Sequence, residues 1–286
     1  MRQFFVATNP EKDKGSRYTN KIREYLEGKG CTCQRTPDGW RLDEPLMIPE
    51  GTECIIVLGG DGTLLRVARS THMLQIPLIG INLGTLGYLT DINKDAIYPA
   101  MDKLINDDYV IEHRIMLYGK VIRNGEVILR DTALNDIVIS RGGHSKMIYL
   151  ENYINGHILN KFRADGVIVS TPTGSTGYSL SAGGPIIAPD ADLLLLTPLA
   201  PQSLIDRSVV IKSENGITVK LGQDKGGPFI ATVVFDGDTI LEIESGDEIE
   251  IKKSKRDTLI AKISDTSFLE VLYAKMNPQA LTEVMK

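Results

Sequence analysis

The sequence predicts an α/β N-terminal domain with a parallel sheet, followed by a β-rich domain and a C-terminal segment that packs back on the first domain. Strand and helix patterns alternate as far as about residue 113, which is typical of a parallel sheet with helices on its faces. Beyond that point, short strands follow one another with turn residues between them. We therefore expect domains at 1–113 and 114–256, with 257–286 returning to the first domain.

The first domain alternates strands with helices. An apolar run at 4–8 predicts a strand, and apolar residues at helical spacing from Tyr18 predict a helix that ends at Gly28 and Gly30. The β-branched run at 54–58 has the composition of a strand that is covered on both faces. The remaining expected elements are a helix after the glycine turn at 59–63, a strand over 77–81 and a helix over 97–105.

The second domain is expected to contain β-hairpins. Asn124-Gly125 and Asn155-Gly156 each separate two apolar stretches, and Asn-Gly tolerates the positive φ angles of a type I′ turn. A helical pattern over Phe268–Met276 follows this domain. The expected strands cover 120–122, 127–129, 167–169, 193–196, 209–211, 217–221, 230–235, 240–243 and 249–251.

The composition restricts the classes of function. The chain has 286 residues, 42% of them hydrophobic and 24% charged, which is ordinary for a soluble globular protein. A net charge of −5 argues against a general nucleic-acid or membrane-surface binder. No secretory pattern and no apolar run of about 20 residues occurs. Cys31, Cys33 and Cys54 form an odd set without a disulfide framework, so we expect a reducing, cytoplasmic setting and structural thiols.

The first segment that carries chemistry is Gly-Gly-Asp-Gly-Thr at 59–63, between a buried strand and a helix. Glycines without Cβ atoms let backbone N–H groups approach a phosphate, and the helix N-terminus adds its positive dipole end. Asp61 could then take a proton from an attacking hydroxyl or face a bound Mg²⁺. The alternative interpretation is a glycine turn with an aspartate helix cap.

The second segment, Asn-Leu-Gly-Thr-Leu-Gly-Tyr at 82–88, follows the next strand. Loops at the carboxyl ends of strands form the ligand crevice of an open α/β sheet, so two such glycine loops suit one extended ligand. Tyr88 could stack on a base or fill the domain junction.

A third segment, at 163–179, contains Arg-Ala-Asp-Gly, a strand, and then Ser-Thr-Pro-Thr-Gly-Ser-Thr-Gly-Tyr-Ser. Its hydroxyl and N–H donors could bind phosphate or ribose. Upstream, Asn135 and Asp136 lie between apolar residues, and buried polar side chains there would need partners that a ribose or an adenine could supply.

These motifs exclude several classes and resemble one family. The chain has no dinucleotide-binding Gly-x-Gly-x-x-Gly at Gly60 or Gly84, no P-loop, no zincin motif and no nucleophile elbow. In order from about residue 54 to 240, the motifs closely resemble the NAD kinase family, whereas Gly-Gly-Asp-Gly alone is shared with diacylglycerol and sphingosine kinases. Two departures stand out, because the family often has Ala where this chain has Gly177 and Glu where it has Asp136.

The resemblance implies phosphorylation of the adenosine ribose 2′-hydroxyl of NAD by ATP, with Asp61 as the base. Mg²⁺ would arrive with ATP, and no dedicated protein metal site is expected. Asn135 and Asp136 would hold a ribose, Asp165 the nicotinamide end and Tyr178 the adenine region. The full expected nucleotide-binding set is Gly60, Gly62, Thr63, Arg66, Asn82, Tyr88, Asn135, Asp136, Arg163, Asp165, Thr173, Thr176, Gly177, Tyr178, Ser181, Ala200 and Asp236.

The implied partners are NAD, ATP and further copies of this chain in a dimer or tetramer, with neither nucleic acid nor membrane. Two alternatives belong to other classes. A lipid kinase of the diacylglycerol type would need an apolar entrance and a membrane-binding face, and the acidic balance of the chain gives this little support. A non-catalytic NAD(P)-binding regulator would bind NADP without making it.

Overall fold

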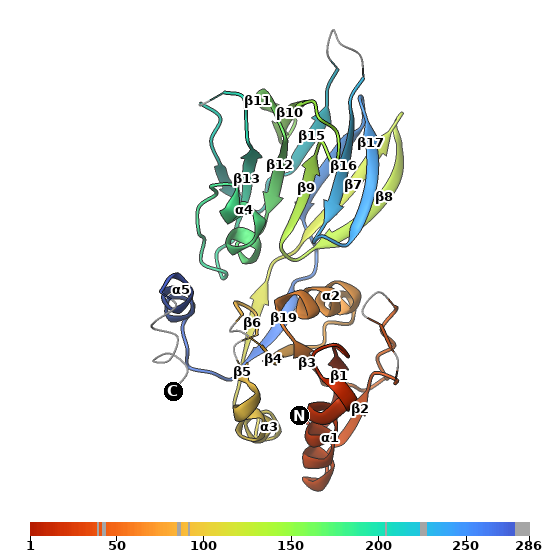
Figure 1. Cartoon of the computed structure of the whole chain (residues 1–286), viewed down its shortest axis with the longest axis vertical. Coiled ribbons are helices and arrows are strands. Elements are labelled where there is room, and N and C mark those ends of the chain that lie inside the picture. The colour runs from red at the N-terminus through yellow and green to blue at the C-terminus, as the bar shows by residue number, and fades with distance from the viewer. Residues whose placement is uncertain are drawn as a thin grey trace. The chain divides into compact units, whose positions relative to one another are not determined.

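The structure is a computed structural model that describes residues 1–38, 40–41, 44–84, 87–90, 92–203, 205–223 and 228–277. Contacts divide the chain into two compact units (Figure 1). Unit 1 comprises Met1–His113 together with the chain from Thr258 onward, and unit 2 comprises Arg114–Asp257.

Unit 1 is built on a largely parallel sheet in the order β2-β1-β3-β4-β19-β6, with β5 also paired to β4. The pairs β1–β2, β1–β3, β3–β4 and β4–β19 are parallel, which confirms the fold expected from the alternating pattern. Its strands are β1 (Gln3–Thr8), β2 (Thr32–Arg35), β3 (Cys54–Gly59), β4 (Leu78–Asn82), β5 (Ile92–Asn93), β6 (Val110–Arg114) and β19 (Thr258–Lys262). Its helices are α1 (Arg17–Gly28), α2 (Asp61–Thr71), α3 (Ile97–Ile105) and α5 (Phe268–Met276).

Burial explains why these segments take these forms. Every residue of β3 is buried, as expected for a strand covered on both faces. Helix α1 buries Thr19, Ile22 and Leu26, which lie on one face at helical spacing. Gly30, with φ of +77°, follows the end of that helix in the left-handed conformation that glycine adopts at no steric cost. The core of unit 1 therefore lies between the sheet and its helices.

Unit 2 contains two antiparallel sheets that share one hydrophobic core. Their orders are β11-β10-β15-β18-β7-β8 and β14-β13-β12-β9-β16-β17. A Cβ on Gly119 of β7 would lie 2.6 Å from the Phe235 ring of β16, so the two sheets approach closely there. The strands are β7 (Leu117–Arg123), β8 (Glu126–Ala133), β9 (Asp136–Ser140), β10 (Ile148–Ile154), β11 (His157–Ala164), β12 (Gly166–Ser170), β13 (Leu193–Leu199), β14 (Val209–Lys212), β15 (Ile217–Leu221), β16 (Ile230–Phe235), β17 (Thr239–Glu244) and β18 (Glu248–Lys253).

The Asn-Gly turns have the predicted geometry. Asn124 and Gly125 have φ of +53° and +81°, and Asn155 and Gly156 have φ of +50° and +79°. Two successive positive φ values are the mark of a type I′ turn, so both hairpin predictions are confirmed.

The segment after β12 differs from its prediction. The sequence pattern predicts a single hydroxyl-rich turn over 170–179, whereas the structure has a 3₁₀ turn at Thr173–Thr176 and a short helix α4 at Tyr178–Ser181. Elements of one turn are too short to leave a readable apolar period, which is why the pattern missed them.

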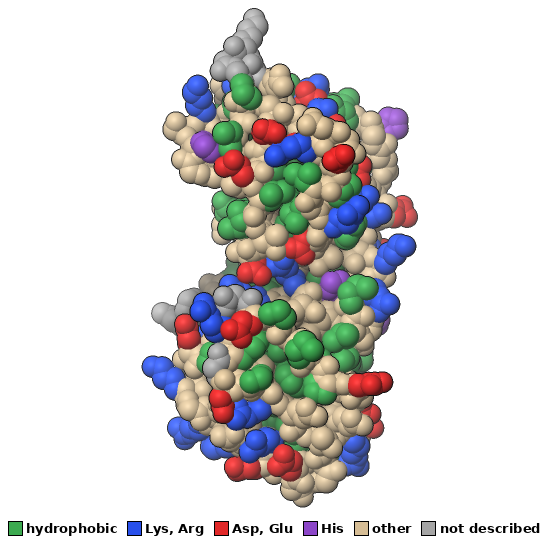
Figure 2. Space-filling model, turned by 90° about the vertical axis from the view of Figure 1, so that its right-hand side faces the viewer, with side chains coloured by type: hydrophobic (Ala, Val, Ile, Leu, Met, Phe, Trp, Pro, Cys, Tyr) green, Lys and Arg blue, Asp and Glu red, His purple; other side chains and the backbone are tan. Residues whose placement is uncertain are grey.

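The surface of each unit mixes both signs of charge. On the face drawn in Figure 2, acidic and basic side chains are interspersed, with hydrophobic groups between them. No field of a single sign covers either unit on this face, in keeping with the modest net charge of −5. Within the described residues, no helix combines the length and apolarity needed to span a bilayer.

Candidate functional site

The glycine turn of unit 1 joins β3 to the N-terminus of α2. Gly60 is extended at the N-cap position, and no side chain caps the helix. A Cβ on Gly59 would overlap the side chain of Thr63, so glycine is needed where the helix returns over the strand. A Cβ on Gly62 would meet nothing within 4 Å. The N-terminus of α2, where its first N–H groups lie, is thus an open helix end of the kind that binds anions.

The Asp61 carboxylate holds the neighbouring loop. Its Oδ2 accepts a hydrogen bond from Tyr88 N at 2.8 Å. Its Oδ1 accepts from Leu89 N at 3.1 Å, Thr90 N at 3.2 Å and Thr90 Oγ1 at 3.0 Å. A Cβ on Gly87 would overlap this carboxylate, so only glycine permits the approach. The helix-cap interpretation of Asp61 is wrong, because the N-cap residue is Gly60 and Asp61 is the first residue of the helix.

The second glycine loop is attached to the first. Leu83 N donates to Gly59 O at 3.0 Å, and the buried Asn82 side chain accepts from Gly84 N at 2.7 Å. Asn82 therefore shapes the start of this loop. Thr85 and Leu86 of the same motif lie outside the described residues.

Tyr88 contacts the C-terminal helix α5 of the same unit. Its ring centroid lies 6.4 Å from that of Phe268, and Lys275 Nζ lies 4.6 Å from the Tyr88 centroid. Val271 and Ala274 are buried beside it. Burial, together with the charge of Asp61, raises the pKa of the Tyr88 hydroxyl. In this structure the Tyr88 ring therefore packs against α5. This contact bears out the expectation that the C-terminal segment packs on the first domain.

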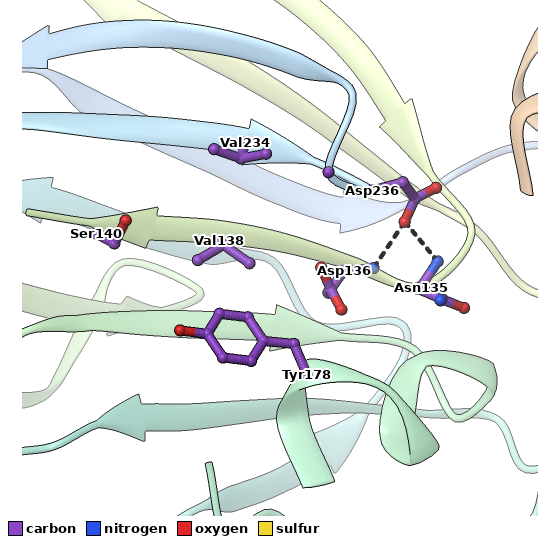
Figure 3. A pocket seen from close by; sticks show the side chains of 8 residues that line it. Asn135, Asp136, Val138, Ser140, Tyr178, Val234 and Asp236 are labelled. Atoms are coloured by element: carbon purple, nitrogen blue, oxygen red, sulfur yellow. Dashed lines mark hydrogen bonds between the residues drawn. The ribbon is translucent and has the colours of Figure 1, made fainter. Parts of the chain in front are cut away.

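Unit 2 has a cavity of about 380 Å³ on the outer face of the sheet that contains β9 and β16. Asp136 and Val138 of β9 face it, whereas Ile137 and Ile139 of the same strand belong to the core, as the alternation of a strand requires. Figure 3 shows the Tyr178 ring lying along the cavity, opposite Val138. The lining residues are Asn135, Asp136, Val138, Ser140, Tyr178, Val234, Asp236 and Gly237.

Asp236 fixes the backbone at the end of this cavity. Its carboxylate accepts from the main-chain N–H groups of Asn135 at 2.8 Å and Asp136 at 3.0 Å (Figure 3). It also accepts from the main-chain N–H of Leu134 at 2.7 Å. Asp236 has φ of +48° and precedes Gly237 with φ of +72°. It is therefore both part of an Asp-Gly turn and the residue that orients the Asn135-Asp136 pair.

The Asp136 carboxyl is buried beside a second acid. Only 7% of the residue is exposed, and burial, with the charge of Asp236, raises the pKa of Asp136 to about 7. At neutral pH this carboxyl can therefore donate or accept a hydrogen bond. Ser170 lies opposite Asp136 in the β9–β12 register. The motif contains Ser170, but the predicted site set omits it.

Polar atoms near this cavity lack partners. Among the described residues, Asn135 Oδ1, Ser170 Oγ and Thr173 Oγ1 are buried and accept or donate no hydrogen bond. Buried polar groups are usually satisfied, and of these three residues Asn135 lines the cavity, where a polar ligand could satisfy it.

The segment after β12 docks against the Asn135 backbone. Thr171 donates through its hydroxyl to Leu134 O at 2.6 Å and through its N–H to Asn135 O at 2.9 Å. A Cβ on Gly174 would overlap the Asn135 carbonyl, so glycine is required there. A Cβ on Gly177 would lie 3.7 Å from Asn135 Nδ2. Thr176 Oγ1 donates to Thr173 O at 3.3 Å within the turn. The structure therefore brings this segment beside the Asn135-Asp136 pair.

Other predicted residues are not among those that line the cavity. Asp165 pairs with Arg141, its Oδ1 lying 2.7 Å from Arg141 Nε. Backbone hydrogen bonds from Asp165 N to Leu199 O and from Gln202 N to Arg163 O place Arg163, Asp165 and Ala200 in one corner of unit 2. Ser181 is exposed at the end of α4. In unit 1, Arg66 is half-buried on α2, and Thr63 Oγ1 accepts from Asn9 Nδ2 at 3.3 Å.

The predicted set omits two residues that lie at the glycine turn, in loops after β1 and β4. Lys12 Nζ would lie 2.8 Å from a Cβ on Gly60, and Thr90 Oγ1 donates to Asp61 Oδ1. The rule that ligand loops follow the carboxyl ends of parallel strands would have pointed to both.

Within the described residues, no group of three or more His, Cys, Asp or Glu side chains is placed to hold a metal ion.

Family models match most of the chain. The model of the ATP-NAD kinase N-terminal domain matches residues 3–109, and that of the ATP-NAD kinase C-terminal domain matches residues 134–263. An NAD kinase from Agathobacter rectalis is 43% identical over an alignment 285 positions long, gaps included, that covers 96% of this chain and 99% of that protein. An NAD kinase from Lachnospira eligens is 42% identical over an alignment 293 positions long, gaps included, that covers 96% of this chain and all of that protein.

Solved structures share the fold. An NAD kinase from Archaeoglobus fulgidus in complex with ATP superposes with a TM-score of 0.76 at 27% identity, covering 96% of this chain and 98% of that one. A yeast NADH kinase complexed with NADH gives a TM-score of 0.84 at 24% identity, covering 96% and 87%, a likeness of fold alone. From these matches in sequence and fold, the chain belongs to the NAD kinase family.

Proposed function

We propose that this chain transfers the terminal phosphate of ATP to the adenosine ribose 2′-hydroxyl of NAD, producing NADP and ADP. The observation that carries the proposal is the Asp61 carboxylate, held in a fixed orientation beside an open, glycine-lined helix N-terminus. A related NAD kinase, from Archaeoglobus fulgidus, has been crystallised with ATP.

The donor side of the reaction belongs to the glycine turn. Free N–H groups at the start of α2 suit phosphate oxygens, and the space over Gly62 leaves room for them. Mg²⁺ carried with ATP would neutralise the phosphate charge when bound. Asp61 is the carboxylate at this turn, and four donors already engage it, so the ion would be held mainly by phosphate oxygens and water.

The hydrogen bonds on Asp61 divide its two oxygens into different roles. Oδ1 accepts three hydrogen bonds, which orient the group, whereas among the described residues Oδ2 accepts only the one from Tyr88 N. A carboxylate oxygen has two lone-pair directions, so Oδ2 retains one for the 2′-hydroxyl. In the reaction, Oδ2 would take the hydroxyl proton as the ribose oxygen bonds to the γ-phosphorus and ADP leaves.

The cavity of unit 2 is proposed to hold part of the dinucleotide. Its Asp136 carboxyl and the unpartnered Asn135 Oδ1 suit the hydroxyls of a ribose. The Tyr178 ring, 50% exposed beside them, offers a face for a base. The assignments of Arg66, Arg163, Asp165, Ser181 and Ala200 to the nucleotide remain part of this proposal.

We also propose a cytoplasmic enzyme that works as a homo-oligomer with magnesium. The three free, buried cysteines support a reducing compartment. Light scattering on a sizing column would measure the dimer or tetramer, and replacing Mg²⁺ by a chelator should abolish turnover.

The test of function is a choice between acceptors. Purified protein is supplied with ATP, Mg²⁺ and either NAD or a diacylglycerol, and NADP is measured with an NADP-specific dehydrogenase. We expect NADP from NAD and no phosphorylated lipid. The opposite pattern would establish a lipid kinase, and NADP binding without NADP formation would establish a regulator. Exchanging ATP for polyphosphate and NAD for NADH in the same assay defines the donor and acceptor range.

A further inference from the structure

A lysine outside the recognised motifs lies directly over the glycine turn. A Cβ built on Gly60 would lie 2.8 Å from Lys12 Nζ. Gly60 is the N-cap residue of α2, so the ammonium group lies at the helix end where the N–H groups emerge. Glycine at this position leaves the space that the ammonium occupies.

The loop that carries Lys12 is anchored to both sides of the turn. The Asn9 N–H donates to Leu58 O at 2.9 Å, before the turn, and Asn9 Nδ2 donates to Thr63 Oγ1 at 3.3 Å, after it. Lys12 N in turn donates to Asn9 O at 3.1 Å. Asn9 is buried, so these bonds are shielded from water. The backbone position of Lys12 is therefore set by the same residues that shape the turn.

The charge of Lys12 has no partner among the residues that the structure describes. Its side chain is exposed, and no acidic side chain lies within ion-pair distance of it among the described residues. The nearby Asp61 carboxylate already has four hydrogen-bond donors from the loop at 88–90. An unpaired cation beside an open helix N-terminus makes this end of unit 1 a site for a polyanion.

We infer that Lys12 binds the phosphate chain of the donor nucleotide at the glycine turn. The inference rests on the proposed function and adds a residue to it. Ammonium, helix N–H groups and helix dipole converge on one place in unit 1, which is the requirement for holding several phosphate oxygens at once. A triphosphate fits this requirement better than the two singly charged phosphates of NAD.

The test compares Lys12→Met with Lys12→Arg and with the control Lys14→Met. Lys14 is also exposed and lies two residues away, but it is not at the turn. Losing a charge-assisted hydrogen bond of this kind weakens binding by roughly ten- to a hundredfold. We expect Lys12→Met to raise the KM for ATP by about tenfold or more, with the KM for NAD unchanged. Lys12→Arg should recover most of the loss, and Lys14→Met should match the wild type.

A binding measurement separates this inference from the proposed function. Inorganic tripolyphosphate is titrated into each protein by calorimetry, which requires no turnover, and thermal melting confirms that each variant is folded. Weaker tripolyphosphate binding in Lys12→Met alone supports the inference even in a protein that makes no NADP. Unchanged tripolyphosphate binding, or a rise in the KM for NAD in place of that for ATP, overturns it.

Discussion

Replacing Asp136 by Asn should stabilise the protein, and the gain should depend on pH. In the folded protein, burial and the charge of Asp236 raise the pKa of Asp136 to about 7, whereas an unfolded chain releases this proton near pH 4. Between these pH values the folded state binds more protons, so wild-type stability falls as the pH rises. The Asp136→Asn protein has no such proton to lose and keeps nearly the same shape.

The expected size follows from the difference between the two pKa values. A difference of about 3 between the two pKa values lowers the free energy of unfolding of the wild type by on the order of 4 kcal/mol once the pH exceeds 7. At pH 5 the wild type has lost only about 1.5 kcal/mol of stability in this way, and below pH 4 it has lost roughly none. Asp136→Asn should therefore exceed the wild type in free energy of unfolding by a few kcal/mol at pH 8 and by much less at pH 5.

Urea unfolding followed by far-ultraviolet circular dichroism measures this difference, because the signal reports the loss of secondary structure, to which the strands of unit 2 contribute. The matched control is Asp190→Asn, an exposed acid of the same unit, for which the difference from the wild type should be small and the same at both pH values. If Asp136→Asn is equally stabilised at pH 5 and pH 8, or destabilised at pH 8, the account of the buried acid pair is refuted.

Two further substitutions test the other close contacts. Thr90→Val removes the hydroxyl that donates to Asp61 Oδ1 and should lower kcat by roughly tenfold with little change in the KM for NAD, whereas Thr90→Ser should retain activity. Steady-state kinetics on both variants measures these effects. Equal kcat in Thr90→Val and wild type would exclude a role of the Thr90 hydroxyl in positioning Asp61. Gly174→Ala places a Cβ against Asn135 O and should destabilise unit 2 by about 1–3 kcal/mol, whereas Gly143→Ala, with nothing within 4 Å, should not. Equal urea midpoints for these two variants would contradict the packing.

Much of the fold could be predicted because its signals are local. The buried run of β3 and the apolar spacing of α1 are each contained within one element, and both predictions are confirmed. The Asn-Gly hairpins likewise depend on two residues that tolerate positive φ. The short helix α4 escaped prediction because a single turn has no period, and the pairing of β19 with β4 joins segments far apart in the sequence.

The candidate site was only partly predictable, for a related reason. The motif identifies Asp61, but its hydrogen bonds to 88–90 depend on the adjacency of β3 and β4. Contact of Tyr88 with α5 depends on the return of the chain end to unit 1. The raised pKa of Asp136 comes first from its burial and then from the charge of Asp236, one hundred positions later in the sequence. Residue types can be read from a sequence, whereas the partners that set their chemistry come from the fold.

The most direct measurement of the central claim is single-turnover NADP formation by Asp61→Asn. An amide cannot take the hydroxyl proton, although it fills nearly the same space in the loop at 88–90. We expect the rate of phosphoryl transfer to fall by roughly 10²–10⁴, with the Kd for NAD by calorimetry unchanged within a few-fold. A rate close to that of the wild type, with NAD bound equally well, would contradict the assignment of Asp61 as the base.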